Sequence, residues 1–496
     1  MISAEKFYSY LGELIVEERD VRADAFPSCA VKVNKLTPGG IFIAFDDEEN
    51  DGLEHLDEAV AVPASVIATT MDYDELPQAV RDNSIGYMKI IRPTLFAAKA
   101  AELFAGFPAG QLKLYSVTGT NGKTTSVSLL YQILKHHYGK AGLISTVGCE
   151  NGCETLQTGY TTPPPFVTQE ILAQMVNHGI PAAALENSSH GLDQFRTSSA
   201  KFQAAIFTNL SGDHLDYHKT MENYFAAKAR MFSELIAPDG VGVVNIDDPW
   251  GEKLFKLTIE HGHRCATVGQ KEDATWKIEN MQLSGSGTEY DLSNKQFGRV
   301  KIKTPLCGAH NVYNTAEVAV AAIETGIPRE EVVKVLANNI QVPGRLERLS
   351  NGKIDCFVDY AHTDDALCRV LSAVKPWCKG KLIVVFGAGG DRDRTKRPRM
   401  GKVAADIADI AVITSDNPRT EPPQQIIDDI CSGIPDGTAC RCIVEPDRHN
   451  AIKMAIKELA CEGDVVVLAG KGHETYQEIN GVRTHFDDRE EAAKWL

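Results

Sequence analysis

Short apolar runs alternate with longer amphipathic segments along most of the chain. In the middle of the sequence, the apolar runs are 112–117, 182–185, 204–207 and 242–246. They have the length and composition of buried strands, and the segments between them have helical spacing. This alternation favours a parallel sheet with helices on both faces, so the expected fold class is α/β.

The same pattern returns in the C-terminal third, where we expect four more strands at 356–359, 382–386, 410–414 and 465–469. A polar or glycine-rich cluster follows each of these runs. Ligands of open parallel sheets bind beyond the carboxyl ends of the strands. The clusters are therefore candidate binding segments: 359–362, 387–397, 416–419 and 470–474.

Three domains are expected from the length of 496 residues and from the distribution of turn residues. Strands are predicted at 41–45 and 62–69 in the first domain. A segment rich in glycine and proline, 104–111, is predicted to be a linker, and Pro343-Gly344-Arg345 marks a second boundary. The predicted domains are residues 1–105, 106–345 and 346–496.

A glycine-rich segment joins the predicted strand 112–117 to a predicted helix at 124–137. It reads Thr118-Gly119-Thr120-Asn121-Gly122-Lys123-Thr124-Thr125. Backbone N–H groups in such a turn surround phosphate oxygens, and the helix N-terminus adds its positive end. Lys123 would reach the outer phosphates, and Thr124 would offer its hydroxyl to Mg²⁺.

The strict phosphate-loop pattern has a glycine six residues before the lysine, where this chain has Val117. The alternative to phosphate binding is a tight turn followed by a threonine that caps the helix. The strand before the turn and the helix after it favour phosphate binding.

Composition narrows the classes of ligand. A net charge of −16 disfavours nucleic acid, which is bound largely by phosphate neutralisation. We see no apolar run long enough to span a bilayer and no signal peptide, so a cytoplasmic protein is expected. The twelve cysteines have neither zinc nor disulfide-framework spacing and are expected to be reduced thiols.

Two acidic clusters could bind a metal. Glu186 ends the predicted strand 182–185, where a carboxylate beside a nucleotide loop would suit Mg²⁺; the alternative is a helix cap. The sequence Asp213-His214-Leu215-Asp216-Tyr217-His218 suggests a metal or phosphate site, and the alternative is a solvated loop. Lys228, in a helix of small residues, has the composition of an ordinary solvated lysine.

Two further segments have both a structural and a binding interpretation. Asn311 and Asn314 begin a predicted helix at 311–324, where they would cap the helix or contact an adenine edge; a cap is the commoner explanation. Five cations follow the glycines at 387–390, and this arrangement favours an anionic substrate over a merely solvated face. They are Arg392, Arg394, Lys396, Arg397 and Arg399.

Together these motifs resemble, in type and order, those of the Mur ligases, the ATP-dependent amide-bond synthetases of peptidoglycan precursor assembly. The resemblance covers roughly residues 111–490. Within the family, Gly-Gly-Asp-Arg-Asp (389–393), Asp-Asn-Pro-Arg (416–419) and Gly-Lys-Gly-His-Glu (470–474) are similar to the type that adds the third residue of the stem peptide. One segment, 33–39, departs from the family pattern Asp-Ser-Arg that contributes to uridine binding.

The resemblance implies a domain for the UDP-sugar, a central ATPase domain and a C-terminal Rossmann-like domain for the acceptor amino acid. It implies that Lys123, His214, Lys228 and His362 take part in catalysis. Mg²⁺ would be bound by Thr124, Glu186, His214 and a carbamate that CO₂ forms on Lys228. The implied ATP-binding residues are Thr118, Gly119, Thr120, Asn121, Gly122, Lys123, Thr124, Thr125, Asn311, Arg345 and Asp359.

The resemblance also implies binding sites for the two other substrates. Contacts to UDP-muramoyl-dipeptide are implied for Thr161, Thr162, Ser188, Gln194 and Arg196. Contacts to the acceptor, meso-diaminopimelate, are implied for Arg392, Asp416, Asn417, Pro418, Arg419, Gly470 and Glu474.

Arg419 is the residue expected to select the acceptor, because relatives that add lysine lack this arginine. Diaminopimelate has a distal carboxylate that lysine lacks, and an arginine can bind a carboxylate bidentately. An unpaired arginine would disfavour lysine by a few kcal/mol. The expected function is therefore ATP-dependent addition of diaminopimelate through an acyl phosphate, by a monomer. The alternatives are a ligase for lysine or another donor, a kinase or NTPase with the same loop, and a non-catalytic relative.

Overall fold

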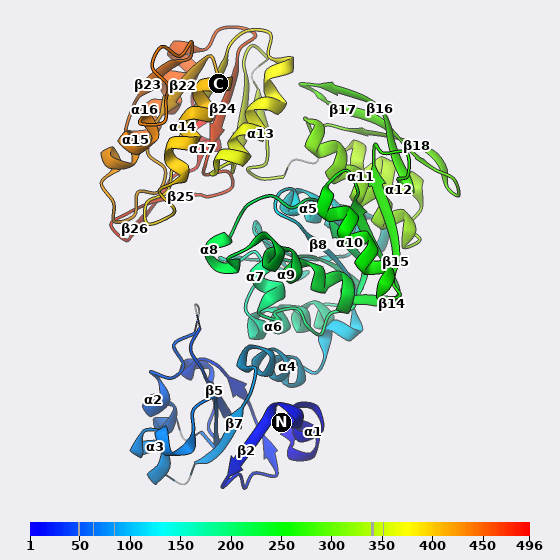
Figure 1. The fold of residues 1–496 in the computed structure, drawn as a ribbon, viewed down its shortest axis with the longest axis vertical. Coiled ribbons are helices and arrows are strands. Elements are labelled where there is room, and N and C mark those ends of the chain that lie inside the picture. The colour runs from blue at the N-terminus through cyan, green and yellow to red at the C-terminus, as the bar shows by residue number, and fades with distance from the viewer. Residues whose placement is uncertain (48–49, 63, 84, 339–341, 351) are drawn as a thin grey trace. The chain divides into compact units, whose positions relative to one another are not determined.

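The computed structural model describes residues 1–496 except 48–49, 63, 84, 339–341 and 351. The chain forms two compact units (Figure 1). Unit 1 contains Met1–Thr267 and Val320–Pro328, and unit 2 contains Val268–Ala319 and Arg329–Leu496. No helix among the described residues is both long and apolar enough to cross a membrane.

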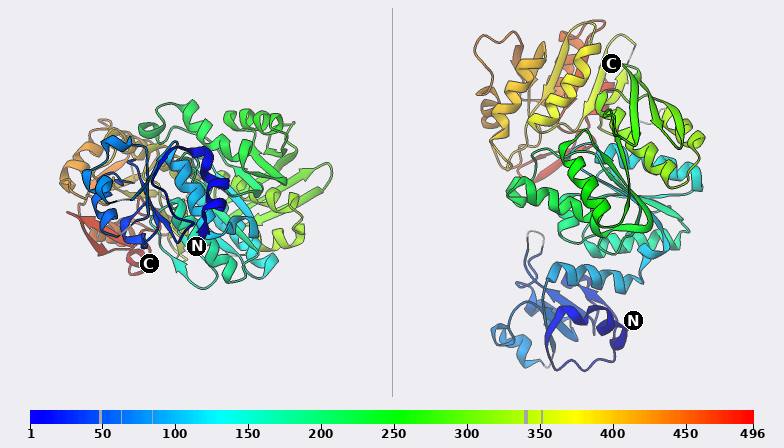
Figure 2. Two further views of the ribbon diagram at one scale, coloured as in Figure 1. Left: turned by 90° about the horizontal axis from the view of Figure 1, so that it is seen from below. Right: turned by 45° about the vertical axis from the view of Figure 1, so that its right-hand side comes forward.

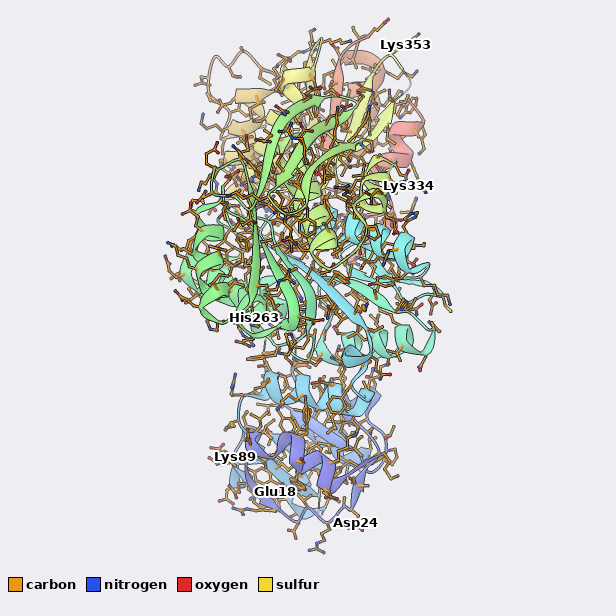
Figure 3. The ribbon with its side chains drawn as sticks, turned by 90° about the vertical axis from the view of Figure 1, so that its right-hand side faces the viewer. Glu18, Asp24, Lys89, His263, Lys334 and Lys353 are labelled. Carbon is orange, nitrogen blue, oxygen red and sulfur yellow. The ribbon has the colours of Figure 1, made fainter. Side chains whose placement is uncertain are left out.

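The first part of unit 1 is a five-stranded sheet with helices on both faces. Its order is β2-β7-β6-β5-β4, parallel except for β2. Glu18 and Lys89, labelled in Figure 3, lie on β2 and β7. The strands are β2 Ile15–Arg19, β4 Cys29–Ala30, β5 Ile41–Ala44, β6 Val66–Thr69 and β7 Gly86–Ile90. Two short strands, β1 Ile2–Ser3 and β3 Ala25–Phe26, form a separate antiparallel pair. The helices are α1 Ala4–Leu11, α2 Leu56–Ala61, α3 Gln78–Asp82 and α4 Pro93–Ala105.

Alternation of side chains along these strands explains the two helical layers. Ile41 and Ile43 of β5 pack in the core that includes α1 and α4, whereas Phe42 and Ala44 pack in the core that includes α2 and α3. The predicted strand 41–45 is confirmed. The predicted strand 62–69 is confirmed only for Val66–Thr69; residue 63 lies outside the described residues.

The second part of unit 1 is the predicted parallel sheet. Its order is β11-β10-β9-β12-β8-β13-β14-β15, with β10 and β11 antiparallel at one edge. The four predicted strands are confirmed here. The strands are β8 Lys113–Thr118, β9 Gly142–Ser145, β10 Gly148–Glu150, β11 Thr155–Leu156, β12 Ala182–Glu186, β13 Phe202–Phe207, β14 Ile236–Asn245 and β15 Arg264–Gly269. The helices are α5 Lys123–Tyr138, α6 Pro165–Asn177, α7 Ser189–Asp193, α8 Leu215–His218, α9 Met221–Glu234 and α10 Pro249–Glu260.

Unit 2 begins with three antiparallel strands that the sequence analysis did not predict. They are β16 Trp276–Ser284, β17 Gly287–Asn294 and β18 Gly298–Thr304. Each buries alternate side chains, for example Tyr290 and Leu292 of β17 and Val300 and Ile302 of β18. The helices that follow are α11 Ala309–Glu324, which the sequence predicted, and α12 Arg329–Ala337.

The C-terminal part of unit 2 is a six-stranded sheet of order β19-β20-β24-β21-β22-β23, parallel except for β19. Successive residues of β21 face opposite cores: Val384 packs in the core with α13, α14 and α15, and Val385 in the core with α16 and α17. Figure 2 shows this part of the chain, coloured yellow to red, from two further sides. The strands are β19 Glu347–Ser350, β20 Asp355–Asp359, β21 Leu382–Phe386, β22 Ile410–Ile413, β23 Arg441–Val444 and β24 Val465–Ala469. The helices are α13 Asp364–Val374, α14 Lys396–Ile407, α15 Pro423–Cys431, α16 Arg448–Lys453 and α17 Asp488–Ala493.

This sheet confirms the four strands predicted in the C-terminal third and the α/β fold class. A hairpin not predicted from sequence, β25 Tyr476–Ile479 with β26 Val482–His485, follows the Gly470–Glu474 segment. Because β20, β21, β22 and β24 are parallel, their carboxyl ends lie along one edge of the sheet. The polar clusters at 359–362, 387–397, 416–419 and 470–474 follow these ends.

Candidate functional site

The glycine-rich loop joins β8 to α5, as predicted. Gly119 has φ +145, and a Cβ there would lie 2.0 Å from Thr208 Oγ1, so only glycine fits this position. The N–H groups of Thr120 and Asn121 donate to the backbone and side-chain oxygens of Asn209, at 2.8 and 3.1 Å. The segment after β13 therefore fixes the conformation of the loop. The loop leads directly into the N-terminus of α5, the geometry that binds phosphate.

Lys123 is the first residue of α5, and its ammonium lies at the loop. Its Nζ donates to the carbonyl oxygen of Thr120 at 2.8 Å. A positive charge at the mouth of a helix N-terminus attracts anionic oxygens. The sequence-based assignment of Lys123 to phosphate binding is consistent with this position.

A buried carboxylate stands next to the loop. Glu186, the last residue of β12, is 1% exposed. Its Oε1 accepts from the Thr124 hydroxyl at 2.9 Å, and its Oε2 accepts from both the N–H and the hydroxyl of Thr146 at 3.1 Å. No ion pair of Glu186 occurs among the described residues. Glu186 is thus not a helix cap, since Ser188 caps α7.

This arrangement fits Mg²⁺. The ion prefers a carboxylate or two together with phosphate oxygens and water, and a buried carboxylate without a cation needs a positive partner. Within the described part of the chain, no three His, Cys, Asp or Glu side chains form a cluster that could bind a metal. A Mg²⁺ ion here would therefore bind Thr124 and Glu186 and take further ligands, among them phosphate oxygens and water.

The composition of its helix suggests that Lys228 is solvated, but the structure buries it beside the loop. It is 1% exposed on α9, and its Nζ donates to the carbonyl oxygen of Gly119 at 2.8 Å. Burial first, and then the charge of Lys123, lower the pKa of Lys228 well below its usual value. A neutral amine is the form that reacts with CO₂, so the site is chemically suited to a carbamate.

Three imidazole rings gather near Lys228. The ring centroid of His190 lies 4.9 Å from that of His214 and 5.5 Å from that of His218. Desolvation is the largest cause that lowers the pKa of His214, and the charges of His190, Lys123 and Lys228 lower it further. A neutral imidazole is the form that can bind a metal.

The five residues expected to bind the muramoyl peptide form a connected group. Arg196 donates to Gln194 Oε1 at 3.1 and 2.6 Å and to the carbonyl oxygen of Thr162 at 2.7 Å. The Thr162 hydroxyl contacts Ser188 Oγ at 3.3 Å, and the hydroxyls of Thr161 and Thr146 are 2.8 Å apart. Through Thr146, this group is continuous with Glu186.

The nucleotide-binding residues predicted in unit 2 have structural partners of their own. Asn311 lies within the first turn of α11 and does not cap it: its Nδ2 donates to the carbonyl oxygen of Cys307 at 2.8 Å, and its Oδ1 accepts from Asn314 Nδ2 at 3.0 Å. The Asp359 carboxylate accepts the N–H groups of Leu346 and Ala361, at 2.7 and 2.8 Å. The guanidinium of Arg345 lies 4.7 Å from the ring centroid of Tyr360.

His362 follows β20 and is exposed. Its Nδ1 lies 2.9 Å from the carbonyl oxygen of Tyr360. The Tyr360 ring is also close to those of His362 and His473, with centroid distances of 4.7 and 5.0 Å. The catalytic role expected of His362 stays a prediction.

A second polar group lies beyond the carboxyl ends of β22 and β24; we call it the Asp416 cluster. It consists of Asp416, Asn417, Arg419, Lys471 and Glu474. Asn417 is its centre, because its Nδ2 donates to Glu474 Oε2 at 2.8 Å and its Oδ1 accepts from Lys471 Nζ at 3.0 Å. Gly470 has φ +115, and a Cβ there would lie 2.4 Å from Asp416 Oδ2, so glycine is required for this approach.

Arg419 is held in place by the β25–β26 hairpin, which Figure 1 labels. Its backbone has φ 51, a left-handed conformation that is unfavourable for arginine. The Arg419 N–H donates to the carbonyl oxygen of Glu478, and the N–H of Asn480 donates to that of Arg419, at 3.1 and 2.7 Å. The guanidinium Nη1 donates to the carbonyl oxygen of Gly390 at 2.7 Å. Pro418 precedes it in the same loop.

The cations after the glycine turn divide into two kinds. Arg397 is 0% exposed and pairs with Glu421 and Asp429, both at 2.8 Å; Arg394 also pairs with Glu421, and Arg399 pairs with Asp364. Arg392 is exposed, has no ion pair among the described residues and donates only to its neighbour's backbone. The complete burial of Arg397 indicates a structural role for this residue, whereas the anionic-substrate interpretation of Arg392, Arg394, Lys396 and Arg399 stays a prediction.

Sequence reasoning missed three functional candidates in these groups. Thr146 joins Glu186 to Thr161, and its position after β9 gave no signal. Lys471 lies between two glycines within a motif that was noted, but nothing in the sequence indicates its complete burial. Arg448 and Asp488 form a buried pair at 2.6 Å, 40 residues apart along the chain.

The phosphate loop, the buried acidic group beside it and the parallel sheets define a nucleotide-dependent enzyme of the α/β class. Two family models match the chain: the Mur ligase middle domain over residues 117–323 and the "Mur ligase, glutamate ligase domain" over residues 344–472. The chain belongs to the Mur ligase family.

Curated relatives match over nearly the whole length. The UDP-N-acetylmuramoyl-L-alanyl-D-glutamate--2,6-diaminopimelate ligase of Gloeobacter violaceus is 40% identical, with 93% of this chain and 92% of the relative covered. A ligase of the same name, numbered 1, from Clostridium acetobutylicum is 39% identical over 98% and 97%. A solved structure of a ligase of this name matches with a TM-score of 0.66 and 33% identity over 96% of both chains.

Proposed function

We propose that this chain is the ligase that uses ATP to join meso-2,6-diaminopimelate to UDP-N-acetylmuramoyl-L-alanyl-D-glutamate, in the synthesis of peptidoglycan precursors. The observation that carries the proposal is the Asp416 cluster. It combines two carboxylates with Arg419 at one edge of a sheet, which suits an acceptor that has both an ammonium and a carboxylate at its distal end. The names of the relatives, which match over more than nine-tenths of both chains, support the same acceptor and donor.

The proposed donor-binding residues and the phosphate loop lie in unit 1. Lys123 and the loop N–H groups would bind the ATP phosphates, and the group around Arg196 would bind the muramoyl dipeptide. The hydrogen bonds from Thr146 connect that group to Glu186, so the proposed sites for ATP and for the muramoyl dipeptide lie next to each other. Mg²⁺ bound at Thr124, Glu186, His214 and a carbamate on Lys228 would neutralise charge on the phosphates.

The chemistry follows from these positions. The D-glutamate carboxylate attacks the γ-phosphorus of ATP, an acyl phosphate forms and ADP leaves. Lys123 stabilises the negative charge that develops on the transferred phosphoryl oxygens. The amine of diaminopimelate then attacks the acyl carbon, loses a proton, and inorganic phosphate leaves from the tetrahedral intermediate.

Arg419 accounts for the choice between diaminopimelate and lysine. Its side chain is half-buried and has one N–H bonded to Gly390. A carboxylate would bind to its other N–H groups, whereas lysine would leave them unpaired at a cost of about 1–3 kcal/mol. We also propose the division into UDP-sugar, ATP and acceptor domains at residues 1–105, 106–345 and 346–496.

A phosphate-release assay tests the proposal. Purified protein with MgATP, UDP-muramoyl dipeptide and either diaminopimelate or lysine should release phosphate with diaminopimelate, much more slowly with lysine, and not when either the peptide or the amino acid is omitted. Release that does not depend on the peptide would indicate a simple NTPase. A stable phosphorylated product would indicate a kinase, and a preference for lysine would contradict the role of Arg419.

A further inference from the structure

Lys471 is a buried lysine that the proposed reaction does not yet use. It follows β24, in the Gly470-Lys471-Gly472 segment, and its side chain is 0% exposed. A lysine is almost never fully buried unless it is paired, because its ammonium is strongly hydrated in water. The groups that contact the Lys471 ammonium therefore indicate the role of this residue.

The Lys471 ammonium faces three members of the Asp416 cluster. Its Nζ donates to Asn417 Oδ1 at 3.0 Å and lies 3.9 Å from Asp416 Oδ1 and 3.7 Å from Glu474 Oε2. The partners lie on the loop after β22 and on the loop of Lys471 itself. Lys471 thus joins the two loops that follow β22 and β24.

Lys471 alone does not balance the two carboxylates that it faces. Asp416 and Glu474 bring two negative charges and Lys471 offsets one of them; the other is left for a ligand ammonium when Arg419, the second cation of the cluster, binds the ligand carboxylate. Arg448, the other buried cation nearby, is matched by Asp488 in a fully buried pair. Burial and the charge of Asp416 raise the pKa of Glu474, whereas Lys471 and Asn417 lower it.

Lys471 also orients Asn417. The amide oxygen of Asn417 accepts from Lys471 Nζ and from the N–H of Glu478, both at 3.0 Å. Two donors on one side fix this end as the oxygen, so the NH₂ end points to Glu474. Without Lys471, the amide would lose its charged donor, and Asn417 would hold Glu474 less firmly.

We propose that Lys471 is a positioning residue that sets the charge and geometry of the Asp416 cluster, so that the cluster binds the single ammonium at the distal end of a zwitterionic amino acid. The remaining negative charge matches this ammonium, and Arg419 matches the carboxylate beside it. The inference rests on the proposed function, since it assumes that the acceptor binds at this cluster.

A double-mutant cycle between Lys471 and Glu474 tests the proposal. Lys471→Met keeps most of the side-chain volume and removes the charge. We expect it to raise KM for diaminopimelate about 10–100-fold, the usual effect of losing a charged hydrogen bond, with KM for ATP within about twofold. Lys471→Arg keeps the charge and should retain more affinity than Lys471→Met.

The second leg of the cycle uses the background Glu474→Gln. The Glu474→Gln variant has already lost one negative charge of the Asp416 cluster. In this variant, Lys471→Met should therefore raise KM for diaminopimelate by a smaller factor than in the wild type. Lys402→Met is the matched control, because Lys402 also pairs with a carboxylate, Asp406, but is 59% exposed on α14. It should leave both KM values unchanged.

Several results would overturn the inference. They are equal increases in KM for ATP and diaminopimelate, the same factor in both backgrounds, or a change in melting temperature without a change in KM. If Lys471→Met does not fold, the Lys471→Met/Glu474→Gln protein is compared with Glu474→Gln, and a KM ratio above about 10 contradicts the proposal. If the wild type itself releases no phosphate with diaminopimelate, the proposed function fails instead.

Discussion

The phosphate loop is made by eight consecutive residues, 118–125, whereas the Asp416 cluster is assembled from two loops that are more than 50 residues apart. In the loop, backbone N–H groups and a helix N-terminus carry the chemistry, so local geometry is sufficient. In the cluster, the hydrogen bonds of Asn417 with Lys471 and Glu474 join side chains that follow two different strands. A local motif can be recognised in sequence, but the balance of charges in a distributed site becomes visible only in the fold.

Each region also contains a buried lysine, and the two lysines have different surroundings. Lys228, beside the loop, has no carboxylate partner among the described ion pairs, and its pKa is lowered. Lys471 lies within 4 Å of two carboxylates. The first environment favours a neutral, reactive amine, whereas the second surrounds the amine with carboxylates. The same residue type therefore serves chemistry in one region and electrostatic positioning in the other.

The largest effect is expected at the loop. Lys123→Ala should lower kcat about 10²–10³-fold, because a charge that stabilises the transferred phosphoryl group is removed. Steady-state phosphate release measures the change. Lys135→Ala, an exposed lysine on the same helix, is the control. Equal turnover of the two variants would remove Lys123 from the reaction.

Lys228 should give the next largest effect. After removal of CO₂, wild-type activity should fall and bicarbonate should restore it, whereas Lys228→Ala should stay on the order of 10–100-fold less active with or without bicarbonate. The assay is phosphate release under CO₂-free and bicarbonate-supplemented conditions. Bicarbonate that activates the variant would contradict the carbamate.

Arg419 tests the other region. Arg419→Ala should raise KM for diaminopimelate about 10–100-fold and leave KM for ATP nearly unchanged, because the distal carboxylate loses a charged partner. The same variant should also show a smaller preference for diaminopimelate over lysine. Initial rates with both acceptors measure these changes. A parallel rise in both KM values would mean that Arg419 supports the fold rather than the acceptor.

The smallest effect on activity is expected from Glu421, which follows Arg419 in the chain and pairs with Arg397. Its hydrogen bonds with Arg397 are the largest cause that lowers its pKa from 4.5 to about 2. A lowered folded-state pKa stabilises the protein above the unfolded value, and this stability is lost as pH falls from about 4.5 towards about 2. Glu421→Gln should therefore lose about 1–3 kcal/mol at pH 7 and less at pH 3.

Urea unfolding of both proteins at pH 7 and pH 3 measures this difference. The gap between wild type and variant should narrow on acidification. A gap that is the same at both pH values would show that the stability does not depend on the ionised form of Glu421.

The sequence predicted parallel strands such as β12 and β21 because each is a short apolar run, and the loop because its residues are contiguous. It missed β9, β15 and β23, which are also parallel. It did not predict β16–β18, whose alternate burial of residues such as Tyr290 and Leu292 is weaker than a continuous apolar run. Nor could it show that Arg397 is paired internally while Arg392 is exposed. That distinction depends on Glu421, which lies in the loop after β22 and pairs with Arg397 of α14.

The most direct test of the central claim, that ATP energy is captured as an acyl phosphate before the amine attacks, follows an oxygen atom. UDP-muramoyl dipeptide labelled with ¹⁸O in its D-glutamate carboxylates is incubated with MgATP, diaminopimelate and the wild-type protein, and the released phosphate is analysed by mass spectrometry. The account predicts one ¹⁸O atom in each phosphate molecule. Phosphate without ¹⁸O would contradict it.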